Sequence, residues 1–434
     1  MKITTSIVLG LLFMASCNSV KKSFFSRQSP REKYVQKLKD AGLETTLMAM
    51  QWKRAAQKAL DSPLSITLPY RETGYFASES PSATGLQFPV KRGQKIFITC
   101  TENKDSASTL FLDVYEISSN KKSLLASAEK QNDTIQLVVK SDGNWQIVIQ
   151  AGLLETIEYS IDIYAEPSLA FPVAKSGSPK IISTWGTARD GGARSHEGID
   201  ISAKFRSPVI AAADGDVARV ALNNLGGKVV FARDASSGNM LYYAHLDSQI
   251  ATPGQRIKAG DTIGLIGNTG NARNTIPHLH FGIYTFSGAI DPLAFVQPVK
   301  NNFNQIAGNL SSLNKWLHVT SASNVFIAPD EKSMVFKKLL KNDVIKISAA
   351  TGNFYKVVTA DSLEGFLNFN NASAKFIQVY TIEKDVILLN DPAQNQPGKA
   401  LIKSESEIKT IGYFKNYALV NWGHLTGWIS REEL

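Results

Sequence analysis

The sequence predicts a mainly β protein that is divided into several domains, and three observations support this. Its 434 residues are 43% hydrophobic and 20% charged, an ordinary globular composition whose length suggests about three domains. From residue 64 onward, short runs that alternate hydrophobic and polar residues are separated by turn-rich stretches, which is the pattern of β-strands. The tail repeats a pattern of about sixty residues, as tandem structural units do.

The N-terminus, residues 1–16, has the anatomy of a secretory signal peptide. Lys2 is the only charged residue in it, and an apolar run extends over residues 7–15. This run is too short to span a bilayer comfortably, so we expect it to be a cleaved export signal rather than a membrane helix.

The pair Ala15-Ser16 directly before Cys17 resembles the lipobox of bacterial lipoproteins, in which cleavage leaves the cysteine first and its thiol and amine become acylated. Met14 departs from the commoner leucine of that box, so an ordinary signal peptide with a chance cysteine is the alternative. The resemblance implies that Cys17 is lipidated and anchors the protein to a membrane. Asn18 gives no strong inner-membrane retention signal, which by resemblance to enterobacterial sorting favours the outer membrane.

A tether and a helical segment follow over residues 17–63. Ser29-Pro30 has the form of a helix cap and first helical residue, and apolar residues then recur at near-helical spacing until Pro63. The pattern predicts either one long helix or two shorter helices broken at Gly42.

Residues 64–166 are predicted to form a β-sandwich. Alternating runs such as "QKIFITC" and "WQIVIQA" are separated by turn signals, and no cluster of chemically active residues accompanies them. Cys100 is the only cysteine besides Cys17, so a lipidated Cys17 leaves no intrachain disulfide. We therefore expect a spacer or binding module that is held together by packing alone.

Residues 167–298 contain four of the six histidines in a Gly-rich, β-patterned segment. In "PHLHFGIY" the alternation of a strand places His278 and His280 on one face, and Leu279 and Phe281 toward a core. Two imidazoles on one face argue against the ordinary interpretation of a lone, satisfied core histidine.

Upstream, the stretch "RSHEGIDIS" supplies His196 and, four residues later, Asp200. A catalytic zinc ion takes three protein ligands, such as imidazole nitrogen and carboxylate oxygen, and leaves one position for water. His196, Asp200 and one of the paired histidines would complete that set. Glu197 or Asp190 could replace Asp200 as the ligand, and Asp200 could instead cap a loop.

Between these motifs, "GNMLYYAHLDS" places His245 at the end of a strand beside a loop. Its alternation puts Leu241, Tyr243 and His245 on one face. Four further residues neighbour the motifs and are candidates to line a cleft or support it: Asp247, Asn271, Arg273 and Tyr284.

The motifs H-x-x-x-D, A-H-L and H-L-H-F, in this order, resemble those of the lysostaphin-type zinc metallopeptidases, which cut peptide bonds in peptidoglycan. The surrounding stretches "HEGIDISA", "PGQRIKAGDTIGLIGNTG" and "DPLAF" match that family too. The resemblance implies a β-rich peptidase domain in which His196, Asp200 and His280 bind Zn²⁺. It implies that His245 and His278 stay off the metal as catalytic residues, which move protons and stabilise the oxyanion.

The C-terminal part begins with residues 299–316, a polar connector that is predicted to be helical. Residues 317–373 and 374–434 form the internal repeat, because each places a glycine ten residues after a tyrosine (Tyr355 to Gly365, and Tyr417 to Gly427). The order of their expected strands resembles bacterial SH3-like domains, which implies two small barrels. Either these barrels bind cell-wall peptides, or they pack on the enzyme as structural units.

The resemblance implies a zinc-dependent endopeptidase that hydrolyses the peptide cross-links of peptidoglycan and is attached to a membrane by a lipid anchor. A non-hydrolytic wall-binding scaffold that activates other hydrolases is the alternative, because some family members keep the fold and lose ligands. Turns such as "IKAGDTIGLIG" also occur in lipoyl and biotinyl carrier domains, but no lysine lies in the required pattern.

The net charge of +9 suits an anionic polymer or a membrane face. Nucleic acid is not an expected partner, because no stretch combines a basic run with interleaved stacking aromatic residues in a known module. The charge is therefore compatible with the cell envelope as the place of action.

Overall fold

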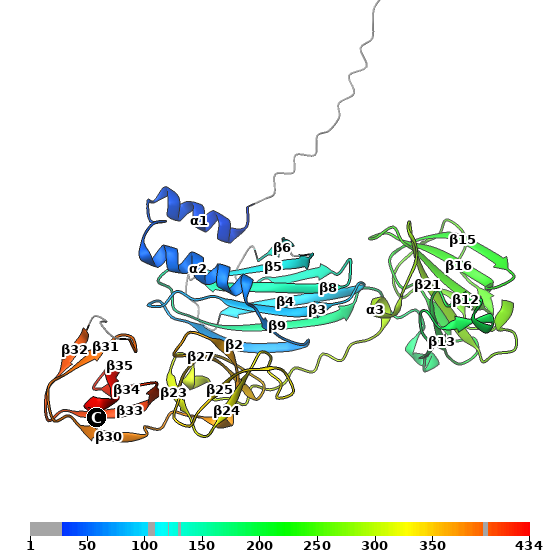
Figure 1. The fold of residues 1–434 in the computed structure, drawn as a ribbon. Helices are drawn as coiled ribbons and strands as arrows, with labels where there is room; N and C mark the ends of the chain where they lie inside the picture. The colour runs from blue at the N-terminus through cyan, green and yellow to red at the C-terminus, as the bar shows by residue number, and fades with distance from the viewer. Residues whose placement is uncertain (1–27, 103–108, 120, 129–131, 394–397) are drawn as a thin grey trace, which may run out of the picture.

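The structure is a computed structural model, and it describes residues 28–102, 109–119, 121–128, 132–393 and 398–434. The predicted signal peptide and Cys17 lie outside these residues. β-Strands dominate the described chain and form several separate sheets, which confirms the mainly β, multidomain fold class (Figure 1). No helix within the described ranges is both long enough and apolar enough to cross a membrane.

Two helices open the described chain, α1 (Pro30–Asp40) and α2 (Leu47–Asp61). Ser29 caps α1 as predicted: its hydroxyl accepts from the Glu32 amide, and the Glu32 carboxylate accepts from the Ser29 amide. The chain turns at Gly42, whose φ of 70° favours glycine, and Thr46 caps α2. Of the two alternatives that the sequence left open, two short helices is correct.

Residues 64–167 form two sheets that enclose one hydrophobic core, here called the sandwich (Figure 1). Its strands are β1 Leu64–Ser65, β2 Tyr70–Phe76, β3 Thr84–Val90, β4 Gln94–Glu102, β5 Leu110–Ser118, β6 Lys121–Ser127, β7 Thr134–Val138, β8 Gly143–Ala151 and β9 Ile157–Pro167. One sheet has the order β1-β3-β8-β5-β6, and the other contains β2-β9-β4-β7. Helix α2 packs on the first sheet, where the Trp52 indole donates to the Ala151 carbonyl at 2.7 Å.

Residues 168–297, here called the histidine unit, lie at one end of the sandwich (Figure 1). Its elements are β10 Lys180–Ser183, β11 Ala188–Arg189, β12 Arg194–Ser195, β13 Ile199–Ser202, β14 Pro208–Ile210, β15 Gly215–Asn223, β16 Gly227–Asp234, β17 Met240–Leu246, β18 Ser248–Gln249, β19 Arg256–Ile257, β20 Thr262–Leu265, β21 His278–Thr285, β22 Gly288–Ile290 and α3 Leu293–Val296. The main sheet has the order β10-β13-β21-β17-β16-β15-β19, and β22 pairs with β21. A smaller sheet has the order β14-β20-β18.

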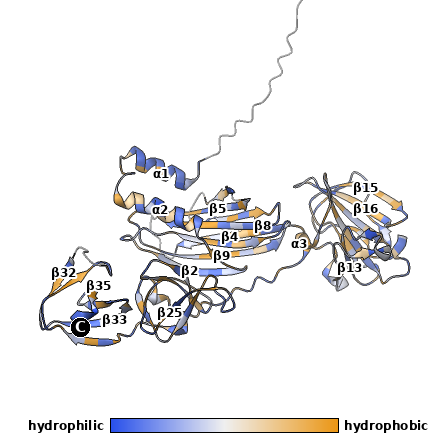
Figure 2. Cartoon of the chain, viewed as in Figure 1, coloured by the Kyte–Doolittle hydropathy of each residue, from blue (hydrophilic) through white to orange (hydrophobic). Residues whose placement is uncertain are grey.

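The side chains of β21 alternate between the core and the histidine cleft, as the sequence predicts. Leu279, Phe281 and Ile283 are fully buried in the core of the histidine unit, so His278 and His280 are left on the opposite face. Figure 2 shows the same mixture of hydrophobic and hydrophilic residues along the strands of the other units. The half-buried strand is thus the structural element that positions the histidine pair.

The connector predicted over residues 299–316 is not a continuous helix: it contains one 3-10 turn, Leu310–Ser312, and the helical prediction is wrong for the rest. Residues 298–309 run without helical structure along the sandwich. The Asn301 amide donates to the Ala165 carbonyl at 3.0 Å, and the Phe303 ring packs edge-on against the Tyr164 ring. These contacts with β9 hold the backbone extended, and the four asparagines of residues 298–309 give the segment little intrinsic helix propensity to oppose them.

The tail forms two β units, residues 316–373 and 378–434, here called the first and second C-terminal units. The strands of the first are β23 Trp316–Val319, β24 Ser323–Phe326, β25 Val335–Leu339, β26 Val344–Thr351, β27 Phe354–Thr359, β28 Glu364–Asn368 and β29 Ala372–Ser373. Those of the second are β30 Gln378–Thr381, β31 Val386–Leu389, β32 Gly398–Ile402, β33 Glu407–Phe414, β34 Tyr417–Trp422 and β35 Leu425–Ser430. The second unit is one sheet of order β30-β33-β34-β35-β31-β32.

The two C-terminal units repeat the same local arrangement, as the sequence repeat indicates. A Cβ on Gly365 would lie 2.8 Å from the Phe326 carbonyl oxygen, and one on Gly427 would lie 2.7 Å from the Leu389 carbonyl oxygen. The residues that follow these glycines pair with the same strand positions (Phe366 with Phe326, and Trp428 with Leu389). Both glycines are therefore required by a close approach of two strands.

The first C-terminal unit is joined to the sandwich. Strand β26 pairs with β2, so that one sheet of order β25-β24-β28-β27-β26-β2-β9-β4-β7 runs through both. Phe326, Phe354 and Phe366 of the C-terminal unit belong to the hydrophobic core of the sandwich. The chain thus leaves the sandwich, forms the histidine unit, and returns to complete the sheet.

A buried ion pair lies at this junction. Lys356 on β27 is 1% exposed, and its ammonium donates to the Glu72 carboxylate at 2.7 Å and to the Thr84 hydroxyl at 3.1 Å. Glu72 is 0% exposed and also accepts from the hydroxyls of Tyr70 and Tyr159. Every partner of this carboxylate must be present for its burial to be tolerated.

We expect Lys356→Met to destabilise the joined unit by about 3–5 kcal/mol, because it leaves the buried Glu72 carboxylate without its cation. The double variant Lys356→Met, Glu72→Gln should recover most of that loss, since no charge then remains buried. Urea unfolding followed by tryptophan fluorescence measures both, with Trp145 in the sandwich core as a reporter. Equal destabilisation of the single and double variants would show that packing rather than charge dominates.

Candidate metal centre and active site

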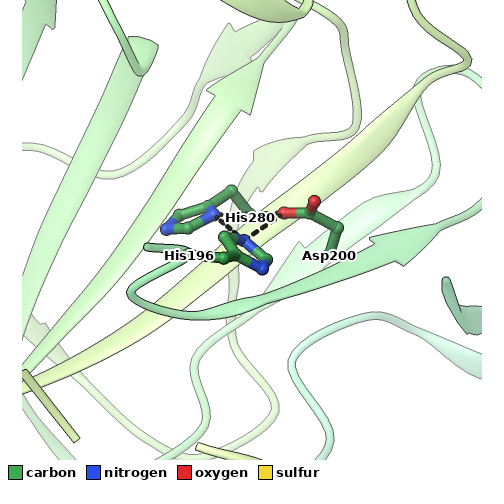
Figure 3. Close-up of side chains that lie close together, drawn as sticks. All are labelled: His196, Asp200 and His280. Atoms are coloured by element: carbon green, nitrogen blue, oxygen red, sulfur yellow. Dashed lines mark hydrogen bonds and ion pairs between the residues drawn. The ribbon is translucent and has the colours of Figure 1, made fainter. Parts of the chain in front are cut away.

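Three metal-ligating side chains of the histidine unit converge on one point: His196, Asp200 and His280 (Figure 3). His196 Nε2 lies 3.0 Å from Asp200 Oδ1 and 3.0 Å from His280 Nδ1, and His280 Nδ1 lies 3.1 Å from Asp200 Oδ1. A proton can join only two of these three lone-pair atoms, whereas one metal ion can join all three. The triangle is therefore the geometry of a metal site.

Strand pairing creates this triangle. Strand β13 runs antiparallel to β21, and Asp200 lies directly opposite His280 in the register. Gly198 allows the His280 ring to lie against the backbone, because a Cβ there would be 2.7 Å from the ring and 2.6 Å from the Phe281 carbonyl oxygen. His196 reaches the same point from the turn that precedes β13.

Contacts behind the ligands fix their orientation. His196 Nδ1 donates to the Thr184 carbonyl at 2.9 Å, so its Nε2 keeps a lone pair for the triangle. Asp200 turns Oδ1 toward the histidines, while Arg189 donates one hydrogen bond to Asp200 Oδ2 and another, at 2.8 Å, to the Ser183 hydroxyl. Arg189 therefore holds the second carboxylate oxygen away from the triangle.

We expect Arg189→Met to weaken metal binding by about 10–100-fold, because residues that orient a metal ligand typically contribute this much. The measurement is competition for zinc with a chelator of known affinity, which needs no substrate. Arg256→Met, an exposed arginine on β19 of the same unit, is the matched control for loss of one positive charge. An Arg189 variant that holds zinc as tightly as this control would contradict the positioning role.

His245 and His278 lie beside the triangle. Their ring centroids are 4.9 Å apart, and the His245 ring is 6.0 Å from the His280 ring. Each donates its Nδ1 proton to a backbone carbonyl, His245 to Thr269 at 2.9 Å and His278 to Ile276 at 2.8 Å. Both imidazoles therefore keep Nε2 as a proton acceptor.

The structure corrects the predicted strand face of His245. Leu241 and Tyr243 on β17 point into the core, but His245 lines the cleft together with Tyr242 and Ala244. The cause is local: His245 has a left-handed φ of 63°, and the pairing of β17 with β16 shifts register beside it. This irregularity turns the imidazole from the core face to the open face.

Burial and neighbouring groups set the protonation of the site. Burial, with smaller contributions from His278 and His280, lowers the pKa of His245 to about 4, so this imidazole is neutral at neutral pH. Burial also lowers the pKa of His280. Burial alone would raise the pKa of Asp200, but the adjacent His196 and His280 outweigh burial and hold that pKa well below its usual range. A metal requires these same states, a carboxylate and neutral imidazoles.

The five residues open onto a cleft of about 970 Å³, and the described residues that line it all fall between 182 and 284. No other unit of the described chain covers it. Asn271 and Tyr284 line the cleft, whereas Asp247 pairs with Arg206 at 3.2 Å. Glu197 also lines the cleft but is not part of the metal-ligating group, and the side chain of Asp190 lies outside what the structure describes.

Sequence reasoning missed two residues of the site, Arg189 and Tyr242. Both line the cleft, and the Tyr242 ring stands edge-on to the His280 ring at a centroid distance of 5.8 Å. Neither belongs to a spaced motif, and a single arginine or tyrosine in a β-rich segment carries no periodic signal. The pairing of β17 with β21 brings Tyr242 to the metal ligands. Arg189 reaches them from the end of β11.

The donor set fits zinc. In a tetrahedral zinc site with bonds of about 2.0–2.1 Å, ligand atoms are about 3.3 Å apart, which is close to the 3.0–3.1 Å between these three atoms. Structural zinc sites close with four protein ligands, whereas this group has three among the described residues and faces an open cleft. The arrangement is therefore that of a catalytic rather than a structural zinc site.

Residues 194–292 match the model of peptidase family M23. The chain carries a peptidase family M23 domain. Its lysostaphin-type resemblance is thereby confirmed, and so is zinc as the metal expected from the His/Asp/His group. The matched residues include His196, Asp200, His245, His278 and His280. Arg189 and the strands β10 and β11 precede the match.

Two relatives of this M23 domain are named as endopeptidases. The chain is 36% identical over 127 residues to the L-Ala--D-Glu endopeptidase of Bacillus subtilis (strain 168), covering 27% of this chain and 39% of that protein. It is 38% identical over 88 residues to the peptidoglycan DD-endopeptidase ShyC of Vibrio cholerae, covering 20% of each. Each match thus spans less than half of the relative's own length.

Among solved structures, the catalytic domain of lysostaphin from Staphylococcus simulans is 30% identical to this chain. The match covers 27% of this chain and 92% of that domain, with a TM-score of 0.25.

Proposed function

We propose that this protein is a zinc-dependent endopeptidase that hydrolyses peptide cross-links of bacterial peptidoglycan. The observation that carries the proposal is a complete set of side chains in one open cleft, with three ligands and two further histidines (His196, Asp200, His280, His245 and His278). The names of the M23 relatives support peptidoglycan as the substrate class. Because those names specify different bonds, the proposal is made for the class of cross-link peptides.

The side chains can share the steps of amide hydrolysis. Zinc, when held by the three ligands, supplies a Lewis acid and lowers the pKa of water to about 7. The imidazole of His245 is neutral, and Nε2 of His245 or of His278 can accept a proton from the attacking water. The protonated ring can then stabilise the oxyanion and return the proton to the leaving amine. The carbonyls of Thr269 and Ile276 keep both rings oriented through these steps.

Mass spectrometry of the fragments released from purified sacculi tests the proposal. The samples are a soluble protein that begins after Cys17 and its His280→Ala variant. Cross-linked dimers should become monomers only with the intact protein, and the new termini would then identify the bond. If neither protein releases fragments while the intact protein holds zinc, a scaffold that activates other wall hydrolases becomes the better account.

We propose the same division of the chain as the sequence indicates. It consists of a signal peptide (1–16), a tether with helices (17–63), a β-sandwich (64–166), the peptidase domain (167–298), a connector (299–316) and two C-terminal repeats (317–373 and 374–434).

We further propose that lipidation of Cys17 anchors the protein to the outer membrane, and that the helices and the sandwich set its reach to the wall. The mass of the N-terminal peptide, with Cys17→Ser as control, tests the anchor. An unmodified cysteine in the exported protein would contradict it.

We also propose that the C-terminal units are SH3-like and that the second one raises the local concentration of the enzyme at the wall. Deleting residues 374–434 should then reduce fragment release from intact sacculi by about 10-fold or more, through lost multivalency. Cleavage of soluble cross-linked fragments should change much less. The first unit is unsuitable for deletion because β26 completes a sheet of the sandwich. Equal loss on both substrates would contradict the targeting role.

A further inference from the structure

A second cavity, of about 500 Å³, lies where helix α2, the sandwich and the first C-terminal unit meet. One side of it is formed by α2, another by β2 and β3 with the loop between them, and the rest by β26 and β27. No residue that lines it also lines the histidine cleft. It exists only because the chain returns to the sandwich after the M23 domain.

Three amines and one carboxylate line this cavity, from Lys58, Lys346, Lys356 and Glu364. Two of the amines are already paired. The Lys356 ammonium lies 2.7 Å from the Glu72 carboxylate, and the Lys58 ammonium lies 3.3 Å from the Glu364 carboxylate. The charge that remains for a ligand is therefore that of Lys346.

Lys346 differs from the other two lysines. It is half-buried, and its ammonium makes no hydrogen bond or ion pair with another described residue. Glu79 is the carboxylate that attracts it, but the Glu79 side chain is itself engaged by Asn314 and Ser78. Burial lowers the pKa of Lys346 by more than the attraction of Glu79 raises it, so part of the cost of burying this ammonium is left uncompensated. An anionic ligand would remove that cost.

The rest of the wall indicates what kind of anion fits. Aromatic side chains (Tyr75, Phe76 and Phe336) are combined with alanines, a glycine and serines, so the space is bordered by rings and by short side chains. Its volume is in the range of about 300–1,000 Å³ that is usual for pockets of small ligands. Phosphate sites are typically built from arginine forks or several amide donors, whereas one ammonium that is not ion-paired, beside rings and short side chains, complements a single carboxylate.

We propose that this cavity binds a short peptide that ends in a free carboxylate, with Lys346 as the counter-ion. The inference rests on the proposed function, because hydrolysis of an amide cross-link leaves one new carboxylate terminus. The cavity would then recognise the product end of a cleaved peptide and keep the protein on wall strands that it has already opened. Helix α2, which follows the tether, closes one side of the cavity and would contact the same ligand.

Isothermal titration calorimetry tests this with the soluble chain after Cys17 in the His280→Ala background, so that the metal cleft neither cleaves nor ligates the probe. The probes are N-acetyl-D-alanyl-D-alanine and its C-terminal amide. The acid should bind at least about tenfold more tightly than the amide, since a charge-assisted hydrogen bond is lost in the amide. No heat from the acid at millimolar concentration would overturn the proposal.

Three variants locate the binding. Lys346→Met should weaken binding of the acid by about tenfold and leave binding of the amide unchanged. Lys338→Met changes an exposed lysine on β25 of the same unit and should alter the affinity for neither probe. Ala55→Phe on α2 should weaken both probes by filling the cavity. Equal binding of the acid to the Lys346 and Lys338 variants would place the site elsewhere and overturn the proposal.

The two proposals can fail separately. With His280 restored, Lys346→Met should cleave soluble cross-linked fragments at the rate of the unsubstituted protein, because the cavity shares no residue with the cleft. Loss of that cleavage in the variant alone would overturn the assignment of a separate binding site. Absence of cleavage in the unsubstituted protein would instead overturn the proposed hydrolase, whatever the calorimetry shows.

Discussion

His280→Ala is expected to lose both zinc and hydrolysis. His280 Nδ1 is one corner of the ligand triangle, and its removal leaves only His196 and Asp200 for a metal that needs three protein ligands. Without the Lewis acid, turnover should fall by about 10³-fold or more. Elemental analysis of the dialysed protein measures the zinc, and the rate of cleavage of soluble cross-linked fragments measures the turnover. Backbone pairing of β21 does not need the side chain, so the fold should persist.

His424→Ala is the matched control for this variant. His424 is exposed in the second C-terminal unit and lines neither the cleft nor the cavity, so its removal should leave zinc content and turnover unchanged. Full zinc content in His280→Ala would contradict the ligand assignment. Glu197, which lines the cleft, would then be the first residue to test as a replacement ligand.

His245→Ala is expected to keep zinc and lose turnover. The His245 ring stands 6.0 Å from the His280 ring and is tied to the Thr269 carbonyl, so it supports the reaction without belonging to the ligand triangle. Removing a positioned general acid–base group typically costs about 10²–10⁴-fold in rate. The same elemental analysis and cleavage assay separate this outcome from that of His280→Ala.

His278→Ala provides the comparison for His245. The two rings are 4.9 Å apart. If they act as one unit, the double variant should be only slightly less active than the less active of the two single variants. Additive losses would show that the two histidines serve separate steps. Loss of zinc in His245→Ala would mean that the metal-binding and proton-transfer roles have been assigned to the wrong histidines.

Much of the site could be predicted from the sequence because its signals are local. The spacing of His196 and Asp200 and the alternation around His278 and His280 depend only on neighbouring residues and the period of a strand. The structure brings these four together, with Asp200 opposite His280 in the register. The helix cap at Ser29 was predictable for the same reason, since a cap involves residues three positions apart.

Two sequence predictions failed, each for its own physical reason. His245 was placed on the wrong face because strand alternation assumes a regular backbone, and the positive φ of this residue breaks it. The connector was predicted to be helical from its polar character, but its asparagines favour a helix only weakly and contacts of Asn301 and Phe303 with β9 hold it extended. A tertiary interaction therefore decides the connector, whereas a local backbone irregularity decides the face of His245.

The sequence by itself determined the β-patterning, the capped start of the first helix, the ligand motif and the repeat in the tail, because each is encoded by residues close together in the chain. Only the tertiary structure decided that β26 continues the sheet of β2, that Lys356 is buried against Glu72, and that Arg189 holds Asp200. These contacts join segments that come together only when the sheets assemble, and pairing over such distances follows from the burial of a shared core rather than from any local pattern.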